Sequence, residues 1–331
     1  MISNSYPWLQ PYRESIAATI KQGRLPHALM LTGQPGMGKA EFADFLARLL
    51  LCEQPLQGSS PCGRCPACTL LNAGSHPDFH YVSFEINEKT GKLREEIVVD
   101  QMRKLAADLS LKSHAGGYKV AVITPANALN PNAANSLLKT LEEPSDNTVL
   151  VLVSDQPGHL PATLRSRCQR FRIGVQDKAA VLAWLSGQLD TPVPEMYLQL
   201  AENAPLEALR LARMDALESR QKHFSELVDI LDGRAAPLAV ALAWSKDEDL
   251  QAVRWLRDWL MDLLRIRMTG QTRAVVGKDI VDGLEVLAGR LDCRILFAQL
   301  DRINRLLHIA GSSLNRQLMT EDILLAWADQ V

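Results

Sequence analysis

Two kinds of hydrophobic pattern divide the chain. Up to about residue 175, short apolar runs rich in branched residues alternate with segments of helical periodicity. The runs at 119–123 and 148–153 contain almost no polar positions, which is typical of strands covered on both faces by helices. This half of the chain is therefore predicted to be an α/β domain over residues 1–175. Its predicted strands are 27–31, 79–83, 119–123, 148–153 and 170–173.

Helical segments fall between these runs and have recognisable ends. A helix is predicted from Glu41 to Leu51, directly after the first strand. Asp100 is placed to cap a second helix, because a short acidic side chain can accept from the first free backbone N–H groups. A third helix runs from Ala134 to Glu143 and ends before Pro144.

After residue 175 the strand pattern disappears and apolar residues recur with the helical period. We expect a small helical domain over 176–210, with an internal loop at 191–194, and a larger helical domain over 211–331. Amphipathic helices by themselves report only burial, so a plain helical bundle explains each of them. Their number in one block also suits a helical oligomerisation surface.

Composition limits the classes of function. The chain has 331 residues, of which 47% are hydrophobic, and its 36 Lys and Arg nearly balance its 38 Asp and Glu. This balance excludes a global basic field that would bind nucleic acid by charge alone. The N-terminal segment lacks a secretory pattern, and the sequence has no apolar stretch long enough for a membrane helix, so a soluble cytoplasmic protein is expected.

The stretch LTGQPGMGKAEF, residues 31–42, resembles a phosphate-binding loop between a strand and a helix. Gly33, Gly36 and Gly38 would bring backbone N–H groups to phosphates, and Lys39 would reach them with its ammonium group. A glycine-rich turn without a ligand is the alternative interpretation.

The groups that would hold Mg²⁺ at this loop are missing. The residue after the lysine is Ala40 where a hydroxyl is needed, and the strand 119–123 is followed by Thr124 and Pro125 where a carboxylate is needed. Neither replacement offers a hard cation a charged ligand. We therefore expect a relic of a loop or a weak ATP site, with no Mg²⁺ site.

Four cysteines lie within seventeen residues, in the pattern C-x9-C-x2-C-x2-C. Soft thiolates at this spacing predict a closed, structural, tetrahedral Zn²⁺ site. An iron–sulfur cluster is the rival, but its next ligand would fall at Asn72, which cannot serve. His76 lies nearby and is expected to pack in its loop, because four thiolates already complete a tetrahedron. The predicted ligands are Cys52, Cys62, Cys65 and Cys68.

Arginines crowd the segment LRSRCQRFR, residues 164–172. Exposed charge on an edge strand is one explanation. The other is an arginine finger that reaches a nucleotide bound by a neighbouring protein. Spacing does not choose between them.

Taken together, these motifs resemble the clamp-loader branch of the AAA+ proteins. The resemblance rests on the loop, the four-cysteine insertion, the segment LLKTLEEP at 137–144 and the triplet Ser166, Arg167 and Cys168. It implies an AAA+ (P-loop NTPase-like) α/β domain with a zinc module at 52–68. A small helical lid at 176–210 and an all-α collar at 211–331 would follow.

Within that branch the sequence is similar to the family of delta-prime subunits of bacterial DNA polymerase III. ATP-hydrolysing relatives carry a threonine, an acidic pair and an arginine where this sequence has Ala40, Thr124 with Pro125, and Leu206. The resemblance therefore implies a subunit without ATPase activity of its own, within the DNA-directed DNA polymerase III holoenzyme. Arg167, in the motif with Ser166 and Cys168, would act in trans on ATP held by a neighbour.

The partners that the resemblance implies are tau or gamma and delta subunits in a hetero-pentamer. Through this complex the chain would meet the β sliding clamp and primed DNA during replication. Two other functions stay open: a catalytically active clamp-loader ATPase, and a zinc-dependent nucleic-acid-binding protein.

Overall fold

The computed structural model describes residues 6–57, 59–87, 90–114, 116–189, 191–246, 250–273, 275–309 and 316–329. The chain divides into two compact units. The first comprises Met1–Gln188 with Ala204–Glu207, and the second comprises Leu189–Asn203 with Ala208–Val331. Each is described by itself. The predicted three-part division at 175 and 210 stays a prediction.

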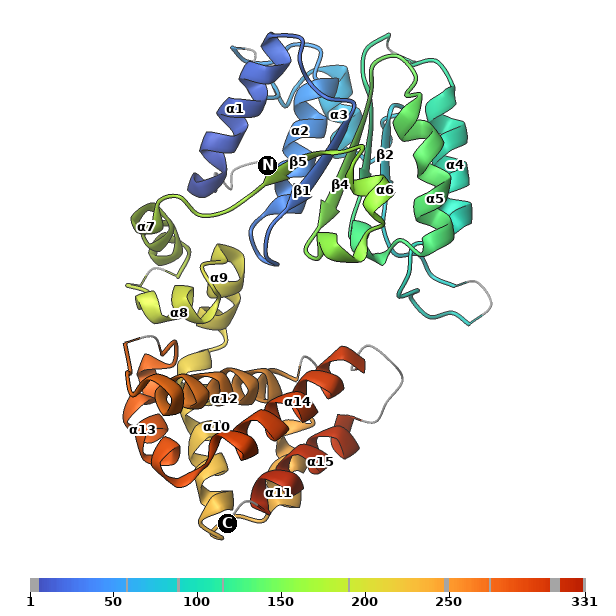
Figure 1. Ribbon diagram of the computed structural model, residues 1–331. Coiled ribbons are helices and arrows are strands. Elements are labelled where there is room, and N and C mark those ends of the chain that lie inside the picture. Colours follow the sequence, from blue (N-terminus) through green and yellow to red (C-terminus); the bar gives the residue numbers. More distant parts are fainter. Residues whose placement is uncertain are drawn as a thin grey trace. The chain divides into compact units, whose positions relative to one another are not determined.

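The first unit is built on a parallel sheet of five strands in the order β2-β3-β4-β1-β5 (Figure 1). All four strand pairs are parallel. The register aligns Thr32 of β1 with Ser154 of β4 and with Arg172 of β5, so the carboxyl ends of these strands lie together. The predicted strands are confirmed within a residue or two. Their bounds are Ala28–Thr32 (β1), Phe79–Val82 (β2), Lys119–Ile123 (β3), Thr148–Ser154 (β4) and Gln169–Arg172 (β5).

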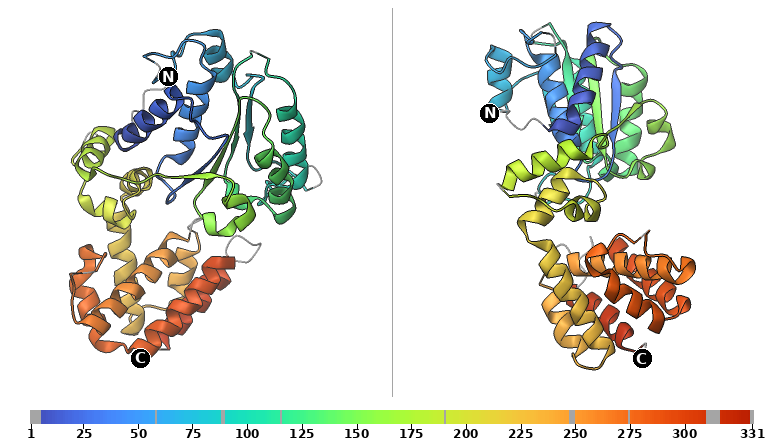
Figure 2. Two further views of the ribbon diagram at one scale, coloured as in Figure 1. Left: turned by 45° about the horizontal axis from the view of Figure 1, so that its top comes forward. Right: turned by 90° about the vertical axis from the view of Figure 1, so that its left-hand side faces the viewer.

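Helices cover both faces of this sheet, as the apolar central strands predict (Figure 2). Helix α2 (Lys39–Leu51) contacts β1, β3 and β4. Helices α4 (Val99–Ser110) and α5 (Pro131–Glu142) pack on each other and on alternate residues of the central strands. The strand residues in that core are Ala28, Met30, Ala121, Ile123, Leu150 and Leu152.

The remaining elements of the first unit are short, apart from α1 and α7. They are the 3-10 helices Pro7–Leu9, Ala126–Ala128 and Pro157–His159 and the helices α1 (Gln10–Lys21), α3 (Pro66–Asn72), α6 (Ala162–Arg165) and α7 (Lys178–Leu189). The edge strand β5 is tied to α1: Gly174, just beyond the strand, donates to the Tyr12 hydroxyl over 2.9 Å.

Side-chain hydrogen bonds fix the starts of α5 and α4, the second with a correction to the prediction. Asn130 caps α5, because its side chain accepts from the Ala133 N–H over 2.9 Å. The predicted cap of α4 by Asp100 is wrong, because the helix begins at Val99 and Val98 is the N-cap. There the side chain of Gln101 accepts from the Val98 N–H over 3.0 Å. A longer side chain at the third helical position therefore does the capping.

The second unit is entirely helical where it is described (Figure 1). In α12 the apolar residues recur with the helical period and all are buried: Trp255, Leu256, Trp259, Leu260, Leu263 and Leu264. The helices are α8 (Glu195–Leu200), α9 (Pro205–Arg213, whose first turn belongs to the first unit), α10 (Ala216–Leu231), α11 (Pro237–Trp244), α12 (Gln251–Thr269), the 3-10 helix Lys278–Ile280, α13 (Val281–Arg290), α14 (Cys293–Ile309) and α15 (Arg316–Ala328).

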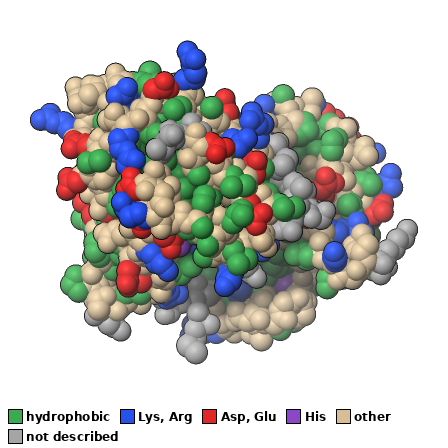
Figure 3. All heavy atoms as spheres, turned by 90° about the horizontal axis from the view of Figure 1, so that it is seen from below, with side chains coloured by type: hydrophobic (Ala, Val, Ile, Leu, Met, Phe, Trp, Pro, Cys, Tyr) green, Lys and Arg blue, Asp and Glu red, His purple; other side chains and the backbone are tan. Residues whose placement is uncertain are grey.

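Long aromatic side chains anchor the core of this unit. Trp327 of α15 is fully buried and donates its indole N–H to the Leu227 carbonyl of α10 over 3.1 Å. Apolar side chains also remain exposed, among them Leu238 and Leu242 of α11 and Leu325 of α15. Figure 3 shows hydrophobic side chains gathered among charged ones on the face seen from below. No helix within the described residues has the length and apolar character needed to cross a membrane.

Candidate functional site

The glycine-rich loop that resembles a phosphate-binding loop lies between the carboxyl end of β1 and the first turn of α2, as predicted. Gly33, Gly36 and Gly38 have φ values of 151°, 77° and 78°, in the region that favours glycine. Gly38 is the N-cap of α2, so Lys39 is the first residue of the helix. The backbone therefore has the conformation of a loop that presents N–H groups to an anion.

The chain's own groups cover this loop. A Cβ at Gly33 would lie 2.6 Å from the Ile173 carbonyl oxygen, and one at Gly36 would lie 2.9 Å from the Glu207 nitrogen. The Leu206 N–H donates to the Gly36 carbonyl over 3.0 Å. The position where ATP-hydrolysing relatives were expected to carry an arginine is leucine here, and it contacts the loop through its backbone N–H.

Trp8 forms a hydrogen bond to a backbone carbonyl of the glycine-rich loop. Its indole N–H donates to the Met37 carbonyl over 2.9 Å, and the Trp8 side chain is buried. Both contacts at Gly36 and Met37 are made by segments far from the loop in sequence. Spacing along the sequence does not indicate either contact.

The ammonium group of Lys39 is already engaged by a carboxylate. Its Nζ lies 2.5 Å from the Asp155 Oδ1 and donates to the Gln34 carbonyl over 2.5 Å. The Lys39 side chain is only 4% exposed, whereas that of Asp155 is 37% exposed. Asp155 follows β4, and β4 pairs with β1, which brings its carboxylate to the loop. A phosphate entering the loop would have to compete with Asp155 for Lys39.

The two positions where relatives that hold Mg²⁺ were expected to carry metal ligands lie near the loop. Ala40 is exposed in the first turn of α2. Strand β3 is followed by Thr124, whose backbone N–H donates to the Val82 carbonyl of β2 over 2.9 Å. The peptide bond between Thr124 and Pro125 is cis. Neither side chain offers a charged oxygen to a cation.

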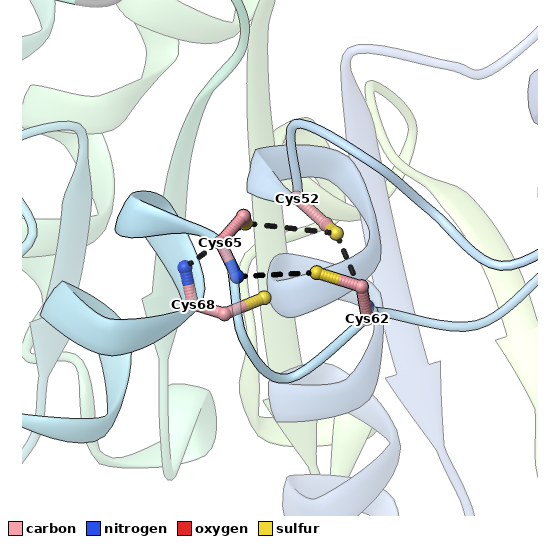
Figure 4. Close-up of side chains that lie close together, drawn as sticks. All are labelled: Cys52, Cys62, Cys65 and Cys68. Atoms are coloured by element: carbon pink, nitrogen blue, oxygen red, sulfur yellow. Dashed lines mark hydrogen bonds between the residues drawn. The ribbon is translucent and has the colours of Figure 1, made fainter.

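The structure gathers the four predicted cysteines into one cluster (Figure 4). Their sulfur atoms all lie within 4.8 Å of one another, and the Cys52 and Cys65 sulfurs are 4.0 Å apart. Tetrahedral Zn²⁺ with Zn–S bonds of about 2.3 Å requires sulfurs about 3.8 Å apart. Among the described residues this is the one cluster of cysteine, histidine or acidic residues that could hold a metal ion. The geometry and the soft donor set fit zinc.

Backbone N–H groups point at the sulfur atoms of this cluster. Cys52 Sγ accepts from the Cys62 N–H over 3.2 Å, and Cys62 Sγ accepts from the Cys65 N–H over 3.3 Å and from the Arg64 N–H over 3.5 Å. Cys65 Sγ accepts from the Cys68 N–H over 3.5 Å and caps α3. Such bonds stabilise negative charge on sulfur, the form that binds a metal.

The thiols differ in their readiness to ionise. Hydrogen bonding from the Arg64 N–H lowers the pKa of Cys62 to about 6. Burial raises the pKa of Cys68 to about 12 and raises that of Cys52 as well. A bound cation would stabilise all four thiolates against the desolvation that opposes them.

Neighbouring side chains fix the segments that carry the cysteines. Glu53 accepts from the Ala67 N–H over 3.2 Å, and Arg48 of α2 donates to the Asn72 side chain over 2.7 Å. His76 is buried, and its Nδ1 accepts from the Asp78 N–H over 3.1 Å. His76 is therefore a loop residue, as expected, and Asn72 is occupied at the end of α3.

Arg167 lies between α6 and β5, and its side chain is 34% exposed. Its Nη1 donates to the Thr163 carbonyl over 2.7 Å, and its Nη2 donates to the Glu142 carboxylate. Ser166 donates to the same Thr163 carbonyl over 3.0 Å. Cys168 packs against the core, and burial raises its pKa to about 11. This triplet thus has one residue facing the core and one arginine reaching the surface.

The other arginines of the segment have different surroundings. Arg170 and Arg172 are exposed on β5, which is an edge strand, so exposed edge charge explains them. Asp155 and Glu142, the two carboxylates that contact Lys39 and Arg167, were not predicted from the sequence. Glu142 belongs to the LLKTLEEP segment, and Asp155 directly follows a predicted strand. Their positions therefore indicated a functional role, but not which side chain each would contact.

Comparison with known proteins places the chain in a family. The family described as "DNA polymerase III, delta subunit" matches residues 10–177, and its "C terminal" counterpart matches residues 214–329. DNA polymerase III subunit delta' of Pseudomonas aeruginosa is 33% identical, over 99% of this chain and 98% of that protein. The subunit delta' of Escherichia coli is 34% identical, over 97% and 94% of the two chains.

Among solved structures, a DNA polymerase III gamma subunit-related protein of Thermotoga maritima covers 96% of this chain and 99% of its own. Its TM-score is 0.49 and its sequence is 17% identical. The relatives from Pseudomonas aeruginosa and Escherichia coli match this chain over nearly its full length. The resemblance found in the sequence is therefore confirmed, and the chain belongs to the family of DNA polymerase III delta' subunits.

Proposed function

We propose that this chain is a non-catalytic subunit of a DNA polymerase III clamp loader. It would assemble with delta and with tau or gamma subunits and help to place the β sliding clamp on primed DNA. In this complex Arg167 would contact ATP bound to a neighbouring subunit. Membership of the family supports assembly with other clamp-loader subunits. The surroundings of Lys39 and Arg167 support a chain that does not hydrolyse ATP itself but acts on a neighbour's ATP.

One observation carries the proposal: the two cations differ in exposure, although each contacts a carboxylate of its own chain. The Lys39 side chain is 4% exposed beside Asp155, whereas that of Arg167 is 34% exposed beside Glu142. A cation that serves its own nucleotide must reach phosphate, and the chain's own groups cover Lys39. Arg167 is at the surface, where a partner's nucleotide could approach it.

The test is Arg167→Ala in the reconstituted complex. An arginine finger contributes on the order of 10³ to 10⁵ in rate in related NTPases. We expect the variant to enter the complex normally and to abolish rapid hydrolysis at the one ATP site that faces this chain. Single-turnover hydrolysis should therefore lose one ATP per complex, while the remaining sites continue.

The matched control is Arg172→Ala, which removes an exposed arginine from the neighbouring edge strand. It should leave both assembly and hydrolysis unchanged. Unaltered single-turnover hydrolysis with Arg167→Ala would contradict the trans role. ATP hydrolysis by the isolated chain at the rate of the motor subunits would contradict the non-catalytic assignment.

Zinc and the domain roles belong to the same proposal. The convergent sulfurs support a structural Zn²⁺ bound by Cys52, Cys62, Cys65 and Cys68, as an insertion in an AAA+ domain. Residues 176–210 would be the lid domain and 211–331 the collar through which the subunits associate. The exposed apolar side chains of α11 and α15 support the collar assignment. Zinc bound by the purified chain should be measurable at one ion per chain.

A further inference from the structure

Arg167 is held by two groups of its own chain. Glu142 is the last residue of α5, and Thr163 lies in α6, so the contacts come from two separate elements. The Thr163 carbonyl accepts from Nη1, and the Glu142 carboxylate accepts from Nη2. The guanidinium group is therefore fixed at both terminal nitrogens, although its side chain is 34% exposed.

The two hydrogen bonds use only part of the donor capacity of this guanidinium group. Arginine has five N–H donors in a rigid plane, and the two bonds to Thr163 and Glu142 engage one on each terminal nitrogen. The plane is oriented while donors remain for a phosphate. A free arginine side chain has many rotamers, and ordering it during docking costs free energy.

We propose that Glu142 is a positioning residue for Arg167, an inference that rests on the proposed trans role of Arg167. The carboxylate holds the guanidinium group in one orientation before the neighbour's nucleotide arrives. The arginine then meets the developing charge of the transition state without first having to be ordered. Small errors in the position of such a group cost large factors in rate.

The ion pair between Arg167 and Glu142 is weak enough for a phosphate to replace Glu142. The Glu142 side chain is 51% exposed, and partly exposed ion pairs contribute little to stability because water screens them. A phosphate that needs the same N–H group can therefore displace the carboxylate without a large penalty. Orientation is the main contribution of Glu142, and stabilisation of the fold is minor.

The charge of Glu142 acts in the opposite direction to its positioning effect, and two variants separate these effects. A carboxylate beside the guanidinium group also reduces the positive potential that a phosphate would feel. Glu142→Gln removes that charge but keeps a carbonyl oxygen that accepts from Nη2. Glu142→Ala removes both the charge and the acceptor.

The experiment compares these variants in the reconstituted complex with delta and the motor subunits. Glu142→Ala should lower kcat at the ATP site facing this chain about tenfold, with KM for ATP unchanged. Glu142→Gln should retain most of the activity. Glu143→Ala, which removes the adjacent exposed carboxylate, is the matched control and should behave as the wild type.

A second measurement links the two residues. In a chain that already carries Arg167→Ala, adding Glu142→Ala should cause no further loss of rate. Normal kcat with Glu142→Ala, or a gain in rate with both Glu142 variants, would overturn the positioning role. If Arg167→Ala itself leaves hydrolysis unchanged, the trans role fails first, so the two failures are distinguishable.

Discussion

At the scale of the residue, we expect a single carboxylate, that of Asp155, to control the access of phosphate to the glycine-rich loop. Its Oδ1 lies 2.5 Å from Lys39 Nζ, the group that would contact a phosphate. Asp155→Asn keeps an oxygen that can accept from Lys39 but removes the competing charge. We expect binding of pyrophosphate, measured by isothermal titration calorimetry, to tighten about tenfold, which corresponds to about 1.4 kcal/mol.

The matching control is Asp100→Asn, which removes an exposed carboxylate from the first turn of α4. It should not alter pyrophosphate binding. If Asp155→Asn also binds no better than the wild type, then the packing of Leu206 and Trp8, and not the charge of Asp155, closes the loop.

His76 is expected to make folding sensitive to acid. Burial lowers the pKa of His76 below its ordinary 6.5, and its Nδ1 accepts a bond that a protonated ring could not accept. The unfolded chain therefore takes up the proton first. The contribution of neutral His76 to the free energy of unfolding is complete above about pH 6.5. It is lost as the pH falls through the lowered pKa, by up to about 1.4 kcal/mol per pH unit.

Urea denaturation at pH 7.5 and pH 5.5 tests this effect. Asn at position 76 can still accept from the Asp78 N–H but does not titrate, so His76→Asn should lose less stability between the two pH values than the wild type. Burial also lowers the pKa of His80, so some loss should remain. His159→Asn, at an exposed position, should lose as much as the wild type; an equal loss in His76→Asn would refute the assignment.

At the scale of elements, we expect the stability of the zinc module at 52–68 and of the adjoining α3 to depend on the cysteines more than on an apolar core. Cys65→Ser is a sharp test, because serine can still cap α3 while it removes a metal ligand. Zinc per chain, measured by mass spectrometry, should fall from about one to near zero. Loss of a metal is among the most destabilising changes, so the unfolding free energy should fall by about 2 kcal/mol or more.

Cys293→Ser, at the start of α14 in the other unit, is the control and should keep both zinc and stability. Limited proteolysis should cut the Cys65→Ser variant within residues 53–64 and spare the control. Full retention of zinc by Cys65→Ser would mean that this sulfur is not a ligand.

Periodicity predicted the elements of the α/β unit well, because its central strands β1, β3 and β4 are buried on both faces and their apolar runs are continuous. The four cysteines were also predictable, since their ligand spacing is local. Contacts between distant elements were not. Asp155 meets Lys39 only because β4 pairs with β1, and Glu142 meets Arg167 across 25 residues. Spacing along the chain carries no information on such pairings until the strand order is known.

At the scale of the whole molecule, the proposed collar role depends on a helical unit that contains a buried ion pair. Arg220 of α10 is fully buried, and its Nε lies 3.0 Å from the Asp279 carboxylate, with the guanidinium carbon 5.2 Å from the centre of the Trp259 ring. Burying both charges costs desolvation free energy that their attraction only partly offsets. Removing one partner is worse, because the other is left buried without its counter-ion.

Arg220→Ala should therefore destabilise the helical unit by about 3 to 5 kcal/mol, measured by denaturant unfolding. Replacing both residues, Arg220→Ala with Asp279→Ala, should cost less than the single change, because no charge is left unpaired. If the helical unit is the collar, the single variant should also enter the reconstituted complex poorly while it keeps its zinc. Normal assembly by a chain with a measurably unfolded helical unit would show that the subunits associate through another part of the molecule.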